Sequence, residues 1–401
     1  MKQTEQIQVK RTPELATLCH LAKNLYNEAN YIIRQEFFKT GRWVRYTTLD
    51  RLLKPSLNYQ ALPSQTSQQL LRLLDKNWVS FFKAIKDWKV HPQKYLGRPK
   101  LPKYKKKNGE AIVIFTNQNA HIRNNCISFP TKCQLAPITT RMAPNFHQIR
   151  IIPQGLSYVI EIVYEQEPMN LELDKDHILG IDLGLRNLVT GVNNIGLTPF
   201  VIKGGVVKSI NQFYNKEKAR LQSSKDLQYY QFITKRLYRL ILKRNNKLKD
   251  YFHKASRRIL NFCIENNLGT ILIGYNSGWK QAIELGRRTN QNFVTVPFLK
   301  FIQQIQYKAK LLGIEVKTNA EDHTSVCSFL DDEPVVHHER YAGKRISRGL
   351  FRAKSGQVIN ADVNGGYNII RKAVPKAFAN GIEGVGLHPY SLTIEPIFVN
   401  E

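Results

Sequence analysis

The sequence predicts a multidomain α/β protein, and three observations support this fold class. The chain has 401 residues, more than one ordinary hydrophobic core accommodates. Hydrophobic residues make up 42% of the chain, which is enough to form a folded interior. Segments with strand-like and with helix-like apolar spacing follow one another along the chain. We therefore expect two or three domains that contain both sheets and helices.

The N-terminal region begins with a strand pattern and continues with helical patterns. Residues 2–10 alternate loosely and predict a short strand. Apolar residues recur at helical spacing in 15–38, and again in 64–88, where they form a broad stripe. These patterns predict a helical recognition domain over residues 11–88.

Strand signals return after the helical region. Short apolar runs recur at regular intervals in 111–165, a pattern typical of a small sheet or barrel. The strand at 2–10 is expected to join them. We therefore predict a wedge-like β-barrel domain that binds nucleic acid, formed by residues 1–10 and 89–175, with the helical domain inserted in it.

The segment 89–107 is an extended basic arm within this predicted domain. It holds eight Lys or Arg residues, three prolines and no acidic residue, so a regular helix is excluded. Such an arm, with interleaved tyrosines, suits a phosphate backbone and base stacking, although a solvated linker has the same composition. The candidate nucleic-acid contacts in the arm are Arg98, Lys100, Lys103, Tyr104 and Lys105.

The remaining residues, 176–401, alternate between strand and helix. The predicted strands are 177–184, 188–194, 197–204, 270–276 and 313–318, and the predicted helices lie within 211–264, 297–312 and 359–373. This order is that of a ribonuclease H-like (RuvC) domain. The helical region before residue 264 is strongly basic and is expected to offer a cationic face. Its candidate nucleic-acid contacts are Lys235, Arg239, Lys243 and Arg244.

The charge balance points to a polyanionic partner. The chain has 60 Lys and Arg against 31 Asp and Glu, a formal net charge of +29. Because self-repulsion of this size opposes compaction, nucleic acid is the expected partner, and a membrane surface is a weaker candidate without a long apolar run. The N-terminus has no apolar signal segment, so we expect a cytoplasmic, nucleoid-associated protein of a prokaryote.

Two aspartates are candidates for a metal site. Asp182 lies in an apolar strand before Gly184, where a carboxylate is costly unless it binds a metal or is hydrogen-bonded. Asp362 begins a predicted helix, where a simple N-cap is the alternative. The string GIDLG at 180–184 also occurs in actin-like ATPases. Leu185 and the two residues after it stand where those proteins carry small hydroxyl residues, which disfavours ATP binding.

Several motifs together resemble the TnpB (OrfB) family of transposon-encoded, RNA-guided DNA nucleases, relatives of type V CRISPR effectors. The matching strings are GIDLGLRNLVT (180–190), DYFHKASRRI (250–259), HTSVCSFLD (323–331) and NADVNGGYNIIRKA (360–373), with LYNEANYIIRQEFF, LLDKNWVSFFKAIKDW and GRPKLPKYK nearer the N-terminus. The resemblance covers nearly the whole chain. It implies a two-metal site for Mg²⁺ (or Mn²⁺), with Asp182 and Asp362 as ligands.

The sequence departs from the family at the second carboxylate. The family places a glutamate in the strand after the basic helices, where this chain has Gly274. The next strand, 313–318, is expected to run parallel to it toward the same edge, and Glu321 and Asp322 come just beyond its end. We therefore expect Glu321 to be the third catalytic and metal-binding residue. Asp322 is the second choice, and an inactive site is the alternative.

The cysteines argue against a zinc site. The five cysteines are scattered and form no C-x-x-C pair, whereas many family members carry two such pairs before the final aspartate. Only Cys327, with His337 and His338 nearby, lies in that interval. We therefore predict a degenerate zinc-ribbon-like insert at about 327–358 without zinc.

These expectations define one leading function and one alternative. The leading function is a Mg²⁺-dependent, RNA-guided DNA endonuclease of a transposon, with a transposon-end-derived guide RNA and double-stranded target DNA as partners. The alternative, favoured by Gly274, is a nuclease-inactive RNA-guided DNA-binding protein that acts as a repressor or transposase accessory. An actin-like ATPase is a weaker third possibility, which the charge opposes.

Overall fold

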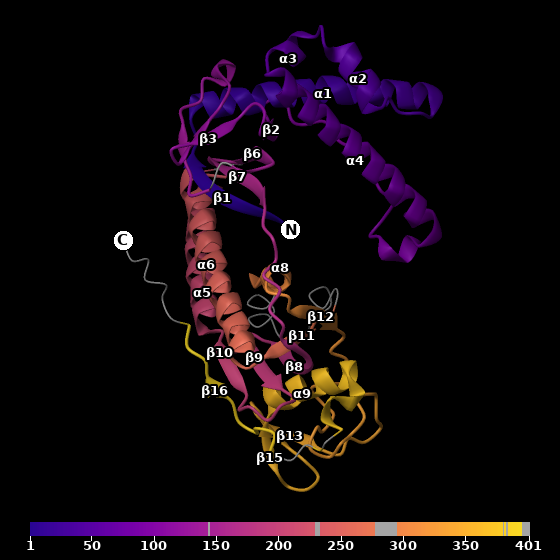
Figure 1. Ribbon diagram of the computed structural model, residues 1–401, viewed down its shortest axis with the longest axis vertical. Helices are drawn as coiled ribbons and strands as arrows, with labels where there is room; N and C mark the ends of the chain where they lie inside the picture. The colour runs from indigo at the N-terminus through magenta and orange to yellow at the C-terminus, as the bar shows by residue number, and fades with distance from the viewer. Residues whose placement is uncertain (143–144, 229–232, 277–294, 380, 382–383, 395–401) are drawn as a thin grey trace. The chain divides into compact units, whose positions relative to one another are not determined.

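The computed structural model describes residues 1–142, 145–228, 233–276, 295–379, 381 and 384–394. Part of the predicted helical region 211–264, residues 229–232, lies outside this description. The chain divides into two compact units, Met1–Gln166 and Glu167–Glu401 (Figure 1). No helix in the described ranges is long and apolar enough to cross a membrane.

The first unit contains the predicted helices. They are α1 (Pro13–Thr40), α2 (Tyr46–Leu53), α3 (Leu57–Gln60) and α4 (Ser64–Val90), followed by the short η1 (Pro92–Lys94). The hydroxyl of Thr12 accepts a hydrogen bond from the Leu15 amide and fixes the start of α1. Gly41 ends this helix with φ of 72°, a conformation that glycine adopts without strain.

The strands of the first unit form two sheets. The larger is antiparallel in the order β1-β7-β6-β2, made of β1 (Lys2–Lys10), β2 (Val113–Thr116), β6 (Gln148–Gln154) and β7 (Ser157–Glu165). The smaller has the order β3-β4-β5, from β3 (His121–Arg123), β4 (Cys126–Ser128) and β5 (Ile138–Thr139), with η2 (Thr131–Cys133) between the last two. The predicted pairing of the N-terminal strand with the later strands is confirmed, while closure into a barrel stays a prediction.

A shared core joins the helices and the larger sheet of this unit. Leu25 and Trp78 from the helices belong to the same buried cluster as Phe115 and Ile160 from the strands. The indole of Trp78 donates to Asn30 Oδ1 at 3.0 Å, so its one polar atom is satisfied inside the core. The helical segment therefore packs as part of this unit.

The second unit is built on a mixed sheet in the order β12-β11-β8-β9-β10-β16. Its strands are β8 (Asp174–Leu183), β9 (Asn187–Asn193), β10 (Phe200–Lys203), β11 (Leu268–Gly274), β12 (Glu315–Asn319) and β16 (Tyr390–Ser391). The first three form an antiparallel meander, and β11 and β12 run parallel to β8. The ends of β8, β11 and β12 therefore reach one edge of the sheet.

Helices cover both faces of this sheet. The helices are α5 (Gly205–Leu227), α6 (Lys235–Glu265), α8 (Phe298–Leu311) and α9 (Ala361–Ala373), with η3 (Pro375–Phe378) after the last. Helices α5 and α6 run side by side (Figure 1). Leu179 of β8 packs in the cluster that contains α6 and α8, whereas Ile178 packs with Tyr367 of α9. Alternate residues of β8 thus face opposite helix layers.

A small antiparallel sheet lies in the insert before α9. Its strands are β13 (Lys344–Ser347), β14 (Leu350–Arg352) and β15 (Val358–Asn360), in the order β13-β14-β15. β15 leads directly into α9. The small sheet therefore fixes where the first turn of α9 begins.

Candidate active site

Asp182 faces α9 because of its position in β8. It shares the parity of Ile178 and Gly180, whose side of the strand packs on α9. A Cβ at Gly180 would lie 2.9 Å from the Gly366 carbonyl oxygen, so glycine lets the helix approach the strand closely. Asp182 Oδ2 lies 3.5 Å from the position of a Cβ on Gly365. The Asp182 carboxylate therefore contacts the first turns of α9.

Asp362 sits in the first turn of α9, but its side chain is not the helix cap. The N-cap is Asn360, whose Oδ1 accepts hydrogen bonds from the amides of Asp362 at 3.0 Å and Val363 at 3.2 Å. The Asp362 carboxylate instead accepts a hydrogen bond from Asn187 Nδ2 at 2.9 Å. Asn360, and not Asp362, is therefore the N-cap of α9.

Glu321 occupies the space beside Gly274. A Cβ at Gly274 would lie 2.6 Å from Glu321 Oε1 and 2.8 Å from its Cγ. The Glu321 amide donates to Asn276 Oδ1 at 2.9 Å, which ties this loop to the end of β11. The Glu321 carboxylate thus lies against position 274, where the resemblance noted in the sequence implies a glutamate.

Asp322 contacts other groups. Its carboxylate accepts a hydrogen bond from Asn276 Nδ2 at 3.3 Å and lies 3.9 Å from Lys372 Nζ. Its side chain is 62% exposed. This arrangement favours Glu321 over Asp322 as the third carboxylate, and the assignment stays a proposal.

The charges of the three carboxylates interact. Burial, followed by the carboxylates of Glu321 and Asp362, raises the pKa of Asp182 well above its ordinary value, and Arg345 opposes this rise. Burial raises the pKa of Glu321 to about 7, with a further contribution from Asp322. Glu321 Oε1 is buried and has no hydrogen-bond partner among the described residues. A cation beside these oxygens would relieve both the repulsion and the missing contact.

The donor set fits a hard divalent cation. Three carboxylates from different elements are the ligands that Mg²⁺ and Mn²⁺ prefer. Within the described ranges, however, no three His, Cys, Asp or Glu side chains stand together at metal-ligand spacing. The three carboxylates are neighbours, and the assembled ligand set remains a proposal.

A pocket of about 590 Å³ opens at Asp182 and Asp362. Asn187, Arg345 and Arg348 also line it. Asn187 Oδ1 is buried without a hydrogen-bond partner in the part of the chain that the structure describes. The sequence reasoning did not identify Asn187 as a site residue, because a polar residue opening a strand has no distinctive pattern. Only its position in the string GIDLGLRN could have drawn attention to it.

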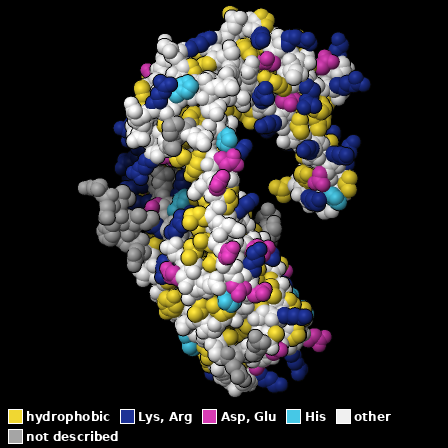
Figure 2. Space-filling model, in the orientation of Figure 1, with side chains coloured by type: hydrophobic (Ala, Val, Ile, Leu, Met, Phe, Trp, Pro, Cys, Tyr) yellow, Lys and Arg dark blue, Asp and Glu magenta, His cyan; other side chains and the backbone are white. Residues whose placement is uncertain are grey.

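The basic arm of the first unit lies along α1. Asn27 Nδ2 donates to the Lys105 carbonyl at 2.9 Å, and Arg34 Nη1 donates to the Pro102 carbonyl at 3.1 Å. The guanidinium of Arg34 also lies over the ring of Tyr104, 5.2 Å from its centroid. These bonds hold the backbone of the arm against α1. The side chains predicted to contact nucleic acid remain exposed, namely Arg98, Lys100, Lys103, Tyr104 and Lys105. Lys and Arg side chains are spread over the visible helices of this unit (Figure 2).

The four basic candidates on α6 divide into two groups. Lys235, Arg239 and Lys243 are exposed. Arg244 instead donates to Asn211 Oδ1 at 2.9 Å and to the Thr295 carbonyl at 2.5 Å, so its guanidinium is used within the protein. Nucleic-acid contact stays a prediction for all four, and Arg244 in addition holds α5 and Thr295 through hydrogen bonds within the protein.

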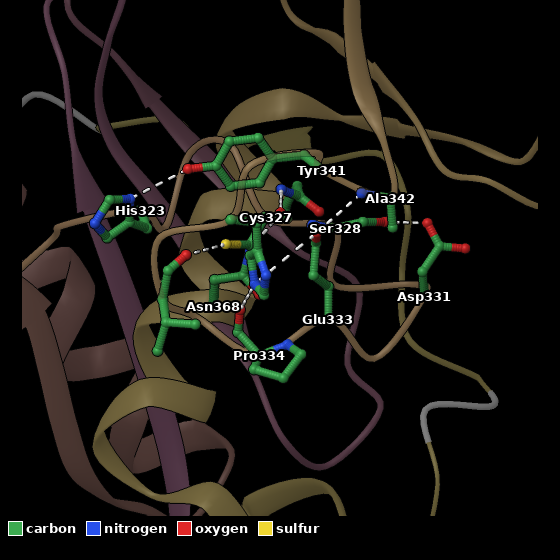
Figure 3. Close-up of polar contacts among 12 residues, drawn as sticks. His323, Cys327, Ser328, Asp331, Glu333, Pro334, Tyr341, Ala342 and Asn368 are labelled. Atoms are coloured by element: carbon green, nitrogen blue, oxygen red, sulfur yellow. Dashed lines mark hydrogen bonds and ion pairs between the residues drawn. The ribbon is translucent and has the colours of Figure 1, made fainter.

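Hydrogen bonds connect parts of the insert that was predicted at about 327–358 (Figure 3). The Cys327 thiol donates to the Val336 carbonyl at 3.5 Å. The buried Glu333 carboxylate accepts from the amides of Ser328 at 2.6 Å and Ala342 at 2.9 Å. His338 Nε2 lies 2.8 Å from the Pro334 carbonyl oxygen. Glu333 therefore links two parts of the loop.

Comparisons with known proteins agree with the sequence motifs. Residues 161–280 match the OrfB family of IS605, described as a probable transposase, and residues 298–369 match a Cas12f1-like TNB domain. The TnpB-like protein ORF457 of Acidianus two-tailed virus is 22% identical, over 90% of this chain and 83% of that protein. The CRISPR-associated endodeoxyribonuclease Cas12f1 of Sulfoacidibacillus thermotolerans is 25% identical, over 56% of this chain and 53% of its own length.

The fold also has a counterpart among solved structures. The cryo-electron-microscopy structure of a Cas12f1–sgRNA–target DNA complex aligns with a TM-score of 0.57 at 15% identity, over 88% of this chain and 81% of that one. At this identity the likeness concerns the fold alone. The sequence matches show that the chain is similar to the TnpB (OrfB) family, and one TnpB-like relative aligns over 90% of this chain.

Proposed function

We propose that this protein is an RNA-guided DNA endonuclease that depends on a divalent metal. The observation that carries the proposal is the Glu321 carboxylate, which lies against Gly274 and raises the pKa of Asp182. In this proposal, a carboxylate from the loop after β12 replaces the one that β11 lacks at position 274. Asp182, Glu321 and Asp362 are the catalytic residues of this proposal.

The strand order supports a ribonuclease H-like assignment for the second unit. β8, β9 and β10 form the antiparallel meander, and β11 and β12 add on the other side of β8 in parallel. In this order the last residues of β8 lie beside the C-terminal end of β11, its parallel neighbour. Asp182 on β8 and Glu321 beyond β12 then approach the same edge from either side of β11.

The three carboxylates share one part in the proposed reaction, which is to hold the metal. Asp182, Glu321 and Asp362 would hold Mg²⁺ (or Mn²⁺), which supplies Lewis acidity to activate water and to stabilise the leaving 3′ oxygen. Asn187 would orient Asp362 through its hydrogen bond of 2.9 Å. Arg345 and Arg348 line the same pocket and would attract the phosphate backbone.

The partners follow from the relatives and the charge. The matched relatives include a CRISPR-associated endodeoxyribonuclease, and the solved counterpart is a complex with guide RNA and target DNA. With a net charge of +29, this chain has the electrostatic requirement for such partners. We propose a guide RNA derived from the transposon end, and double-stranded DNA as the target.

The alternative is a protein that binds guide RNA and target DNA without cutting. Gly274 favours this alternative, and so does Arg345, whose charge near Asp182 partly compensates the carboxylates. Both functions need the same RNA and DNA surfaces. The two functions differ only in whether a divalent metal can bind at the carboxylates in place of the Arg345 guanidinium.

Purification with the native transposon end tests the proposed function. The protein is co-expressed with the flanking transposon DNA, its bound RNA is sequenced, and a plasmid carrying the matching target is incubated with Mg²⁺. We expect RNA from the transposon end and cleavage that requires the matching target, with no cleavage by Asp182→Asn. Bound RNA and target binding with an uncut plasmid in both Mg²⁺ and Mn²⁺ would instead establish the binding-only alternative.

A further inference from the structure

A second pocket, of about 520 Å³, lies at the N-terminus of α5 beside the carboxylate pocket. Gly184, Leu185, Arg186 and Arg348 line both pockets, so the two are continuous. The proposed reaction makes no use of this second pocket.

The first turn of α5 offers backbone donors to this pocket. The amide of Lys208 donates to the Gly204 carbonyl at 3.0 Å, so the amides of residues 205–207 precede the first bond of the helix. In the described part of the chain, no side chain caps this end. A Cβ at Gly205 would meet nothing within 4 Å, so the approach to these amides is open. The helix dipole adds a positive potential at this end.

Asn211 gives independent evidence for a ligand. It lines the pocket and is only 1% exposed. Its Oδ1 accepts a hydrogen bond from Arg244 Nε at 2.9 Å, which fixes the orientation of the amide. Its Nδ2 is buried and has no partner among the residues described. A buried donor without an acceptor is costly, so an acceptor atom arriving in the pocket would be favoured.

The charges around the pocket select an anion. Arg186, Lys208 and Arg348 line it, and none of its described lining residues is acidic. Backbone amides, a buried amide N–H and three cations form the donor set of a phosphate site. A carboxylate ligand would be attracted too, but the continuity with the nuclease pocket favours a polymer of phosphates.

We propose that this pocket binds a backbone phosphate of the DNA strand that enters the carboxylate site. The amides at the start of α5, Asn211 Nδ2 and Lys208 would hold the phosphate oxygens. The inference rests on the proposed function only in naming the bound phosphate as part of the DNA strand that is cut. A phosphate anchored here would fix the strand relative to Asp182 and Asp362.

Substitution of Gly205 tests the inference with matched variants of the full-length protein. Gly205→Asp adds a negative charge beside the phosphate, and Gly205→Asn adds the same shape without the charge. Binding of a fluorescent single-stranded DNA is measured in EDTA across a salt series, so cleavage plays no part. We expect Gly205→Asp to bind about ten-fold more weakly than Gly205→Asn, with a salt slope lower by about one unit.

Stability measurements separate binding from folding. An acidic residue in the first turn favours a helix, so Gly205→Asp is expected to melt no lower than Gly205→Asn. Lys208→Gln should also weaken binding and lower the salt slope, whereas Lys218→Gln, exposed on the same helix outside the pocket, should do so less. Equal affinities and equal salt slopes for the two Gly205 variants would overturn the inference.

Inorganic phosphate distinguishes a strand from a free ion. If the pocket holds a backbone phosphate, a DNA with methylphosphonate linkages should lose the difference between the Gly205 variants. If phosphate stabilises the wild type but both variants bind DNA equally, the pocket binds free phosphate and the strand assignment is wrong. Because these measurements need no cleavage, a failure of the nuclease proposal would leave their outcome unchanged.

Discussion

Asn187, at the start of β9, contacts the Asp362 carboxylate of α9 through its side chain. Its Nδ2 donates to Asp362, while its Oδ1 is buried beside the same pocket. Groups that orient metal ligands contribute to metal affinity although they do not bind the metal. We expect Asn187→Ala to lower cleavage at limiting Mg²⁺ about ten- to hundred-fold. A Mg²⁺ titration measures this, with Asn215→Ala on α5 as the control, and an unchanged titration would rule out the orienting role.

The contact between Glu321 and Gly274 permits a relocation experiment. A side chain at position 274 would meet Glu321 Oε1 at 2.6 Å and Ile369 Cδ1 at 2.5 Å, so Gly274→Glu alone should lower the melting temperature. Removing the Glu321 side chain removes two of the three nearest contacts and leaves the one with Ile369. We expect Glu321→Gly to abolish cleavage and Gly274→Glu with Glu321→Gly to restore part of it. An inactive double variant that folds and binds DNA would contradict the equivalence of the two positions.

The position of Glu321 was predictable from strand geometry. β12 pairs in parallel with β11, with Asn319 opposite Gly274, so the loop beyond β12 returns to the same edge of the sheet. The role of Glu321 as a metal ligand stays a prediction. Asn187 could not be predicted, because its role depends on a side-chain hydrogen bond to Asp362, which lies far away in the sequence. The bonds of Asn360 are local, but Asp362, two residues later, is also a residue type that commonly caps helices, so the sequence did not single out Asn360. The hydrogen bonds of Arg244 to Asn211 and Thr295 could not be predicted either, because a basic helix face does not indicate which of its cations binds within the protein.

Among the elements, long periodic segments were predicted well and short polar strands were missed. The predicted strand 270–276 and helix 297–312 correspond to β11 and α8. β13 is exposed along its whole length, so it has no apolar alternation to reveal it. β16 has two residues only. The start of β8 was also missed, because Asp174–Asp176 are exposed and charged, and the predicted boundary at 175/176 falls inside this strand.

The packing of α6 on α8 makes stability depend on pH. Burial, and then the charge of Lys308, lowers the pKa of His253 to about 4. As the pH falls below the ordinary histidine pKa of 6.5, His253 takes up a proton in the unfolded chain but stays neutral in the folded chain until about pH 4. The free energy of unfolding should therefore fall by about 2 kcal/mol as the pH falls from about 6.5 to 4.

Urea unfolding at several pH values measures this contribution. The fall should be smaller in His253→Gln, which cannot titrate, and unchanged in the exposed control His121→Gln. If the free energy of unfolding falls equally in the wild type and in His253→Gln, the packing of α6 on α8 does not oppose protonation of His253.

The insert before α9 depends on Glu333. Its carboxylate is 7% exposed and accepts two backbone amides. Glu333→Gln would turn a donor toward one of these amides, so we expect a loss of about 1–3 kcal/mol in the free energy of unfolding. The exposed Glu339→Gln is the control, and a zinc chelator should leave the melting temperature unchanged. A melting temperature that falls with the chelator would show that metal holds this loop.

At the scale of the whole molecule, the chain combines a mixed-sheet unit that carries the carboxylates with a helix-and-sheet unit that carries the basic arm. The charge of +29 and the motifs led to the prediction of nucleic-acid binding and to the resemblance to the TnpB (OrfB) family, with which the comparisons agree. They were not sufficient to decide between cutting and binding alone. That decision depends on whether a side chain from one loop reaches the carboxylates of β8 and α9, which sequence spacing leaves open.

Binding and cleavage measured together on one target decide between these functions. Wild type and Glu321→Gln, each loaded with the same guide RNA, are incubated with matched DNA in Mg²⁺, and bound and cut DNA are quantified in the same samples. We expect equal binding by both proteins, and cleavage by the wild type alone. Equal cleavage by both, or binding without cleavage by the wild type, would contradict Glu321 as the replacement carboxylate of a nuclease.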